Sequence, residues 1–263
     1  MAFYASKGTE QINPLPIQLK METSSNRMKF EPPCSDSDCT PDTLFTPGVP
    51  PGSRLPAPRW LRRTNNRECL IFTDGACINN GSENASAGCA VVYRPETSRE
   101  FISRANKQKL DLSRLSLHKL GEISFKMEDE GPYGLDEQEV TKHTSNRAEL
   151  RAVIAALRFR NWVGDGIERL VIATDSEYVA IGAIKWVHCW KHNKWRTSRK
   201  TPVKNKDLWA YLLEELTHWS EEGLEVQFWR VPRHLNSIAD HFANRAAREP
   251  AQPKYTTILG AAC

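Results

Sequence analysis

Apolar runs and helical periodicities alternate along residues 69–248 and predict one α/β domain. Short apolar runs that end in a polar residue are typical of buried strands, whereas apolar residues three and four positions apart mark one face of a helix. These rules predict strands at residues 70–73, 87–93, 122–127, 170–174 and 226–231. They predict helices at residues 146–162, 177–190, 207–219 and 237–248.

The order of these elements predicts the sheet. The first three strands read as antiparallel hairpin strands, and each of the last two follows a helix, so their crossovers are expected to be right-handed. We therefore expect an α/β fold with a five-stranded mixed sheet, three antiparallel strands and then two parallel additions, flanked by helices.

The remaining segments lack this periodicity. Residues 1–66 are rich in Pro, Ser, Thr and Asn and are expected to form a disordered leader. The domain then covers residues 67–249, with a charged surface insertion at residues 95–120 and a C-terminal tail at residues 250–263.

Four acidic residues occupy comparable places in this pattern. Asp74 and Asp175 each close an apolar run, so neighbouring parallel strands would bring both to one edge of the sheet. Glu149 and Asp240 are expected in the first turns of two helices and could converge on the same point. Four carboxylates cannot all stay ionised side by side without cations, and oxygen-only ligands favour Mg²⁺ or Mn²⁺. The pattern therefore predicts phosphodiester chemistry.

Each acid also has a purely structural explanation. Asp74-Gly75 could be turn chemistry, and Glu149 could form a capping box with Asn146. Asp175 could be the N-cap of the helix that follows it, and Asp240 could favour a helix N-terminus through the dipole. Capping does not require the four residues to meet, so a shared site explains the set better.

The motifs Thr73-Asp74-Gly75, Arg147-Ala148-Glu149, Thr174-Asp175-Ser176 and Ala239-Asp240, in this order, resemble the ribonuclease H family, specifically the type 1 catalytic domain of eukaryotes. The resemblance covers about residues 68–248. It implies an RNase H-like fold and two Mg²⁺ ions, with Mn²⁺ as the alternative. It also implies cleavage of the RNA strand of an RNA/DNA hybrid, which leaves a 5′-phosphate and a 3′-hydroxyl.

The resemblance also assigns a role to each acid. Asp74 would bridge both ions, and Asp240 would help to hold the ion that activates water. Glu149 and Asp175 would hold the ion at the leaving 3′-oxygen. His234 is a candidate proton shuttle, but it lies only two residues before Asn236, so the loop is shorter than the family's usual form. A surface role for His234 is an equal alternative.

Substrate contacts follow from the same resemblance. Three of the residues would sense the RNA 2′-hydroxyls, two tryptophans would line the channel for the DNA strand, and the others would contact phosphates. These residues are Asn80, Ser145 and Asn146, with the adjoining Gly75; Trp186 and Trp190; Lys142, Thr144 and Asn205; and Lys191 and Lys194. A tight turn for Asn80, a helix-start motif for Thr144, core packing for the tryptophans and a solvated surface for the lysines are the structural alternatives.

Charge is concentrated rather than large overall. The formal net charge is +4, yet residues 178–206 carry eight Lys or Arg and no Asp or Glu, which suits contact with phosphates. Two competing interpretations keep the same fold. One is a nucleic-acid-binding module without catalysis, and the other is a domain derived from a retroelement.

Cysteine usage and hydropathy suggest a reduced, intracellular protein of the nucleus or cytoplasm. The seven cysteines form no repeated CxxC pair, and we find no membrane-length apolar stretch and no signal sequence. Zinc at Cys34 and Cys39 is not favoured, because a second pair of ligands is missing. We expect a monomer with no membrane association and no obligate protein partner.

Overall fold

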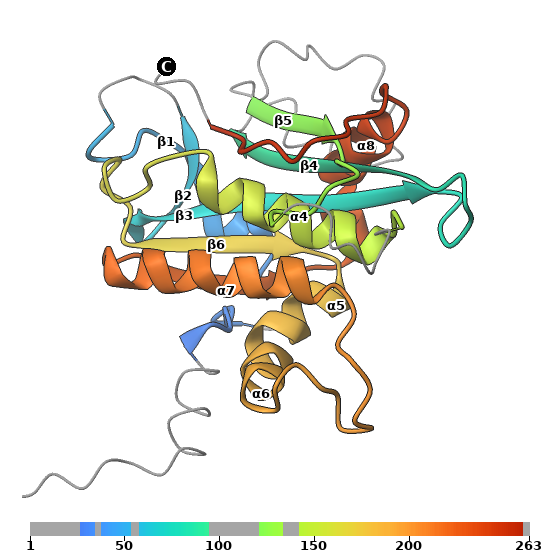
Figure 1. The fold of residues 1–263 in the computed structure, drawn as a ribbon. Coiled ribbons are helices and arrows are strands. Elements are labelled where there is room, and N and C mark those ends of the chain that lie inside the picture. The colour runs from blue at the N-terminus through green and yellow to red at the C-terminus, as the bar shows by residue number, and fades with distance from the viewer. Residues whose placement is uncertain (1–26, 35–37, 54–57, 95–120, 134–141, 260–263) are drawn as a thin grey trace, which may run out of the picture.

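The computed structural model describes residues 27–34, 38–53, 58–94, 121–133 and 142–259 (Figure 1). Its strands are β1 (Phe45–Gly48), β2 (Arg59–Arg62), β3 (Asn65–Ile78), β4 (Ser86–Arg94), β5 (Gly121–Lys126), β6 (Arg169–Thr174) and β7 (Glu225–Arg230). Its longer helices are α4 (Ser145–Arg158), α7 (Lys206–Glu221) and α8 (Ser237–Ala246). The shorter ones are α2 (Pro41–Leu44), α5 (Glu177–Ile181), the π-helical turn η2 (Gly182–Trp186), α6 (Val187–His192) and the 3-10 turn η3 (Arg233–Leu235).

The five predicted strands are confirmed as three antiparallel strands with two parallel additions around the central β3, but the predicted total of five is too low. β3 pairs antiparallel with β4, and β4 pairs antiparallel with β5. On its other edge β3 pairs parallel with β6, which pairs parallel with β7. Two further strands, β1 and β2, extend the sheet from the N-terminal part of β3, giving seven strands among the described residues.

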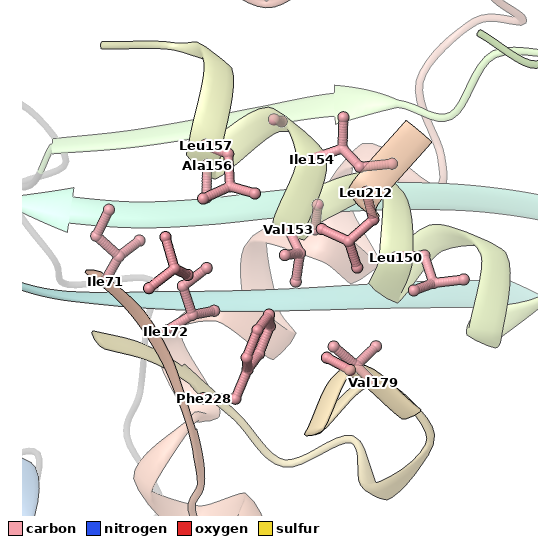
Figure 2. Packing of buried hydrophobic residues seen from close by; sticks show 14 of the residues in the cluster. Ile71, Leu150, Val153, Ile154, Ala156, Leu157, Ile172, Val179, Leu212 and Phe228 are labelled. Atoms are coloured by element: carbon pink, nitrogen blue, oxygen red, sulfur yellow. The ribbon is translucent and has the colours of Figure 1, made fainter. Parts of the chain in front are cut away.

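Helices cover the two faces of the sheet unequally. On one face α4 and α7 enclose the largest core, in which Ile71 and Ile172 of the sheet meet Ile154 and Leu212 of the helices (Figure 2). On the other face α8 covers β3 and β4, with Phe242 in that smaller core. The strands alternate between these environments, as residues of a sheet buried on both faces must.

Two glycines permit the close packing of these helices. A Cβ atom on Gly75 of β3 would lie 2.1 Å from the backbone nitrogen of Glu149, and one on Gly88 of β4 would lie 2.2 Å from that of Ala247. Neither distance is possible for a side chain, so glycine lets α4 and the end of α8 lie directly on the sheet. At Gly75 this contact also fixes the height of Glu149 over β3.

The expected disordered leader is wrong for the described part of residues 1–66; residues 1–26 lie outside the described residues. β1 and β2 join the sheet, and Lys29 forms a parallel bridge with Phe228 of β7. Phe30 and Phe45 are buried against Trp229. The Pro-rich composition concealed these strands because they are short and their apolar partners are distant in sequence.

The described part of the expected tail packs on the domain. The guanidinium of Arg151 lies between the rings of Phe125 and Tyr255, 4.6 Å and 4.4 Å from their centroids. It also donates to both carboxylate oxygens of Glu128, which accepts a further hydrogen bond from the backbone of Thr256. The folded unit therefore continues past residue 249. The predicted insertion at residues 95–120 lies outside the described residues.

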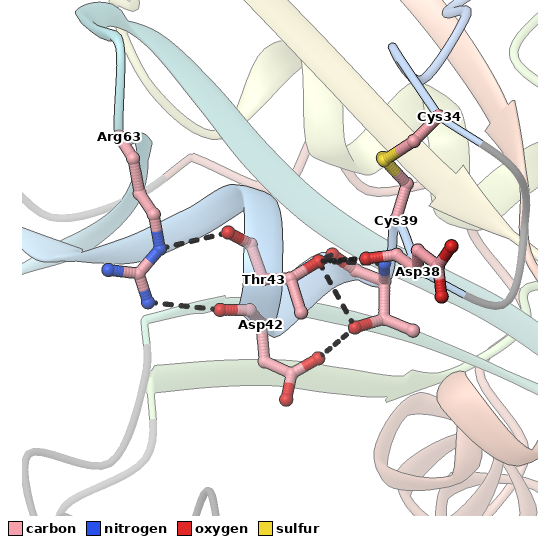
Figure 3. The surroundings of a disulfide bond; sticks show 7 residues. Cys34, Asp38, Cys39, Asp42, Thr43 and Arg63 are labelled. Carbon is pink, nitrogen blue, oxygen red and sulfur yellow. Dashed lines mark hydrogen bonds between the residues drawn. A yellow bond between two sulfur atoms is a disulfide. The ribbon is translucent and has the colours of Figure 1, made fainter.

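One pair of cysteines is oxidised. Cys34 and Cys39 form a disulfide beside α2 (Figure 3), so the expectation of a reduced chain is wrong for this pair. Cys69, Cys77, Cys89 and Cys189 are free thiols. Of the helices in the described ranges, none has the length and apolar character needed to cross a membrane.

Candidate active site

The parallel pairing of β3 and β6 brings two of the predicted acids together. Phe72 lies opposite Ala173, so the same register two residues further on aligns Asp74 with Asp175. Asp74 lies inside β3 and is only 6% exposed, whereas Asp175 directly follows β6 and is half-buried. The two acids therefore lie side by side where the parallel pairing ends, as the sequence predicts, although β3 itself continues to Ile78, beyond the predicted end of this strand.

Glu149 approaches this point from α4. It is the fifth residue of α4, so its expected place in the first turn is wrong. The N-cap is Thr144, whose side chain accepts a hydrogen bond from the backbone of Arg147, so the capping-box explanation for Glu149 is also wrong. The Glu149 carboxylate instead accepts a hydrogen bond from the Ser176 hydroxyl at 2.5 Å.

Ser176 also decides the role of Asp175. The Ser176 hydroxyl accepts a hydrogen bond from the backbone of Val179 and is the N-cap of α5, so Asp175 does not cap this helix. The Asp175 carboxylate accepts a hydrogen bond of 2.7 Å from the side-chain amide of Asn236. Ser176 was not among the predicted site residues, although its position before a helix marks it as a capping residue.

Asn236 joins the three elements of the site. Its side-chain nitrogen also donates to the backbone oxygen of Thr73 at 3.1 Å, and its own backbone oxygen accepts from Asp240. Asn236 is 1% exposed, and its side-chain oxygen has no hydrogen-bond partner among the described residues. The hydrogen bonds of Asn236 therefore tie Thr73 of β3, Asp175 and the start of α8 to one another.

Asp240 lies in the first turn of α8, as predicted, and pairs with an arginine. The distance between the Arg233 guanidinium and the Asp240 carboxylate is 2.7 Å, and this partner raises the pKa of Arg233. Arg233 belongs to the exposed 3-10 turn η3, which it shares with His234. The exposure of His234 is compatible with either of its predicted roles.

The four acids act on one another electrostatically. Burial, together with the negative charges of Asp175, Asp240 and Glu149, raises the pKa of Asp74 to about 8. Burial and Asp175 also raise the pKa of Glu149 to about 7, although the hydrogen bond from Ser176 and the charge of Arg233 oppose this shift. Negative charge is thus concentrated at the four acids. Among the causes of these two pKa shifts, Arg233 is the one group of opposite charge.

The residues fit Mg²⁺ or Mn²⁺ by donor chemistry and charge. The four side chains offer oxygen donors, and the shared charge that raises the pKa of Asp74 is the charge that a divalent cation would neutralise. Within the described ranges, however, no three His, Cys, Asp or Glu side chains already form a metal-binding group. Three of the carboxylates are engaged by protein donors instead, namely by Ser176, Asn236 and Arg233.

The two predicted tryptophans lie in adjoining parts of one helical segment. Trp186 ends the π-helical turn η2 and is 36% exposed, and Trp190 on α6 is half-buried, with 5.7 Å between their ring centroids. Trp190 in turn packs edge-on against the fully buried Trp209. Core packing alone therefore does not explain Trp186. Lys191 and Lys194 follow, and both are exposed.

A buried arginine joins two residues of the predicted phosphate pocket. Arg147 is capped by Thr144 and approaches the Asn205 side-chain oxygen at 3.5 Å. Its guanidinium donates to both carboxylate oxygens of Asp207 in the first turn of α7, and Asn205 precedes this helix as its N-cap. Lys142 is exposed beside this group.

The remaining predicted contacts lie in two places. Asn80 is exposed in the turn between β3 and β4, where Asn79 and Gly81 have positive φ angles of 52° and 85°, so it does belong to a tight turn. Ser145 and Asn146 open α4, while Gly75 is buried beneath that helix.

These features define a class of α/β proteins in which carboxylates gather at the end of central parallel strands, beside an exposed surface of tryptophans and lysines. The profile of the family described as RNase H matches residues 111–252. The chain belongs to the RNase H family.

Named relatives agree with this assignment. Ribonuclease H of Treponema pallidum is 43% identical over 113 residues, which make up 41% of this chain and 63% of that protein. Ribonuclease H1 of Mus musculus is 28% identical over 70% of this chain and 50% of its own. Ribonuclease H of Actinobacillus pleuropneumoniae is 36% identical over 68% of this chain and 90% of its own. The chain thus spans only about half to two thirds of the first two relatives.

A solved structure is similar to this chain at a lower level. The crystal structure of LC11-RNase H1 in complex with an RNA/DNA hybrid has a TM-score of 0.42 and 20% identity, over 68% of this chain and 95% of that one.

Proposed function

We propose that this protein is a metal-dependent endonuclease that hydrolyses the RNA strand of RNA/DNA hybrids and leaves a 5′-phosphate and a 3′-hydroxyl. The observation that carries the proposal is the convergence of four carboxylates: the β3–β6 register aligns Asp74 with Asp175, and hydrogen bonds through Ser176 and Asn236 link Glu149 and Asp240 to them. The raised pKa of Asp74, to which the other three contribute, agrees with this arrangement. Acids arranged only as helix caps would not share their charge in this way. The names of the relatives, ribonuclease H and ribonuclease H1, support the same activity.

Asp74, Glu149, Asp175 and Asp240 would hold the cations, two Mg²⁺ or alternatively Mn²⁺. When bound, such ions lower the pKa of water and stabilise the attacking and leaving oxygens of an in-line displacement. The protein's own part is orientation: Ser176 directs the Glu149 carboxylate and Asn236 directs that of Asp175. Both donors belong to segments that follow sheet strands, so the sheet keeps the acids in place.

The substrate would lie across α4, η2 and α6. Trp186 and Trp190 offer an aromatic surface for the DNA strand, and the exposed Lys191 and Lys194 offer phosphate contacts without sequence preference. Asn80 and Asn146 would contact RNA 2′-hydroxyls, with Gly75 and Ser145 beside them. Lys142, Thr144 and Asn205 would contact a phosphate of the DNA strand near Arg147.

A binding module without catalysis is the second candidate. The observation that favours it is the ion pair between Arg233 and Asp240, because the arginine occupies one of the carboxylates that a cation would need. In that case Arg233 would permanently neutralise part of the acidic site, and hybrid binding would not require Mg²⁺.

Cleavage of a labelled RNA/DNA hybrid separates the two candidates. We expect Mg²⁺-dependent cleavage by the wild type, none of duplex DNA, and none by Asp175→Asn, which keeps the shape of the side chain and should still bind. Hybrid binding that needs no Mg²⁺ and gives no product would establish the binding module instead. His234→Ala in the same assay tests the proton shuttle, since a slowed product release would lower the steady-state rate more than the single-turnover rate.

We also expect the protein to act as an intracellular monomer, in the nucleus or cytoplasm. The basic and aromatic surface would then bind nucleic acid rather than a second subunit. Light scattering of the full chain, with and without hybrid, would test this expectation.

A further inference from the structure

The N-terminal strap, defined here as residues 27–34, 38–53 and 58–63, packs on the part of the sheet beside the one that α8 covers (Figure 1). Its aromatic residues Phe30 and Phe45 pack on Trp229 of β7, with centroid distances of 4.7 Å and 6.3 Å. Leu70 and Val171 from β3 and β6 complete this cluster. The strap is therefore part of the folded domain.

Each end of the strap is hydrogen-bonded to the sheet. At one end Phe30 donates to the backbone oxygen of Phe228 at 3.0 Å, and Phe228 donates to Met28 at 2.8 Å. At the other end β2 pairs with β3. The disulfide between Cys34 and Cys39 lies between these two attachments, and Cys39 is buried. The disulfide therefore joins the half of the strap on β7 to the half on β3.

Helix α2 lies next to the disulfide, and Arg63 at the C-terminal end of the strap holds it in place (Figure 3). The Arg63 guanidinium donates to the backbone oxygens of Asp42 and Thr43 at 3.1 Å and 3.0 Å, and the Arg63 backbone donates to Leu44. These bonds satisfy backbone carbonyls at the end of α2. A change in the geometry of the disulfide would thus act on α2, which these hydrogen bonds hold in place.

The same aromatic cluster reaches the active-site turn. Val231 is one of its buried members, and Leu235 packs against it together with Leu44 of the strap. Leu235 directly precedes Asn236, which holds Asp175, and the turn also carries Arg233, which pairs with Asp240. The strap therefore packs beneath the segment that orients two of the four carboxylates.

We propose that the N-terminal strap positions the turn of residues 231–236 and that the disulfide between Cys34 and Cys39 makes this support sensitive to redox state. A dithiol of the thioredoxin or dithiothreitol class would reduce the disulfide to two thiols, while its own thiols become a disulfide and supply the two electrons and two protons. In a reducing compartment a disulfide is more often transient and regulatory than permanent, which agrees with the expected intracellular location.

The first test compares oxidised and dithiothreitol-reduced protein in hybrid cleavage, and it rests on the proposed function. We expect reduction to lower kcat about fivefold and to leave KM unchanged, because Trp186 and Lys191 bind the substrate elsewhere. A strap that only stabilised the fold would leave kcat unchanged well below the unfolding temperature. An unchanged kcat would therefore overturn the proposal.

Two variants test whether the loss of kcat depends on the disulfide between Cys34 and Cys39. Cys34→Ser/Cys39→Ser should show the low kcat of the reduced protein and no response to dithiothreitol. The matched control is Cys189→Ser, which removes an exposed thiol from the basic surface and should keep the full response. A response that disappears in Cys189→Ser and persists in the double variant would overturn the proposal.

Hydrogen exchange gives a readout that does not depend on activity. The backbone amides of Val231, Leu235 and Asn236 are hydrogen-bonded to Thr174, Pro232 and Arg233 respectively. Reduction should accelerate their exchange severalfold, while the amides of β4 and β5 should not change. If no hybrid is cleaved but these amides respond, the proposed function fails and the strap proposal stands. Equal exchange in both redox states would overturn the strap proposal alone.

Discussion

Two buried acids of this protein, Asp74 and Glu128, have opposite surroundings. Glu128 is 2% exposed and accepts hydrogen bonds on both oxygens from Arg151, which is itself buried between two aromatic rings. Asp74 is 6% exposed, and its strongest charged neighbours are three further carboxylates. The two side chains are buried to a similar degree, so they differ in whether a partner of opposite charge neutralises them.

The difference separates a structural acid from a functional one. A buried charge is tolerated when a partner of opposite charge and further hydrogen bonds satisfy it, as at Glu128. At Asp74 the fold leaves charge uncompensated, which costs stability unless a cation arrives. A site whose uncompensated charge lowers the stability of the fold is a candidate for ligand binding. Substitutions at either acid test this difference.

The largest effect is expected at the functional acids. Asp175→Asn should lower the cleavage rate about a thousandfold, equal to about 4 kcal/mol, because one ion ligand is lost while the shape is kept. Single-turnover cleavage measures this loss. Hybrid affinity should stay within a few-fold of wild type; a rate near that of wild type would remove Asp175 from the site.

The structural acid should respond in stability instead. Arg151→Met leaves Glu128 buried without its partner and should cost about 3–5 kcal/mol of unfolding free energy. Urea unfolding measures this cost. The matched control is the double variant Glu128→Leu/Arg151→Met, which should regain most of the loss because no charge then remains buried. An equal loss in both variants would mean that packing against Phe125 and Tyr255 matters more than charge.

The functional acid Asp74 should make the stability of the metal-free protein fall as pH rises. The pKa of Asp74 rises from an ordinary 3.8 to about 8 on folding, so its contribution is fully present below about pH 4 and is lost as pH rises through 8. Asp74→Asn removes this loss and should stabilise the metal-free protein at pH 8 by on the order of 2–3 kcal/mol, with little effect at pH 4.

The same experiment sharpens the role of cations. Added Mg²⁺ should stabilise wild type at pH 8 and have a smaller effect on Asp74→Asn, because the ion and the substitution remove the same repulsion. Urea titrations at pH 5, 6.5 and 8 provide the measurement. Equal stabilisation of both proteins by Mg²⁺ would place the bound ion elsewhere.

The smallest effect is expected on the exposed basic surface. Lys191→Ala and Lys194→Ala should each weaken hybrid binding a few-fold and reduce the slope of log affinity against log salt by about 1. Lys254→Ala is the matched control, since Lys254 is an exposed lysine in the segment after α8, whose Gln252 bridges Glu128 beyond β5. Fluorescence titration at several salt concentrations would measure the slopes. Equal slopes in all variants would mean that Lys191 of α6 and Lys194 after it point away from the substrate.

The sequence by itself determined the order of the main strands and helices and the place of the acids, because both depend on local patterns. Apolar runs marked β3 and β6, and the residues that end them, Asp74 and Asp175, meet because parallel strands share an edge. Asp240 was placed in the first turn of α8 for the same local reason. Periodicity does not fix helix starts to the residue, so the cap at Ser176 was missed, whereas a helix-start role for Thr144 was one of the alternatives and is confirmed.

Only the tertiary structure decided how the acids are supported. The strap gains its stability from Trp229, almost two hundred residues away in sequence, so no local pattern in its Pro-rich chain reveals it. Asn236 and Ser176 orient the carboxylates across elements that are distant in sequence. Whether a buried acid is satisfied, as Glu128 is by Arg151, depends on which residues the fold brings together, because local patterns carry no information on distant partners.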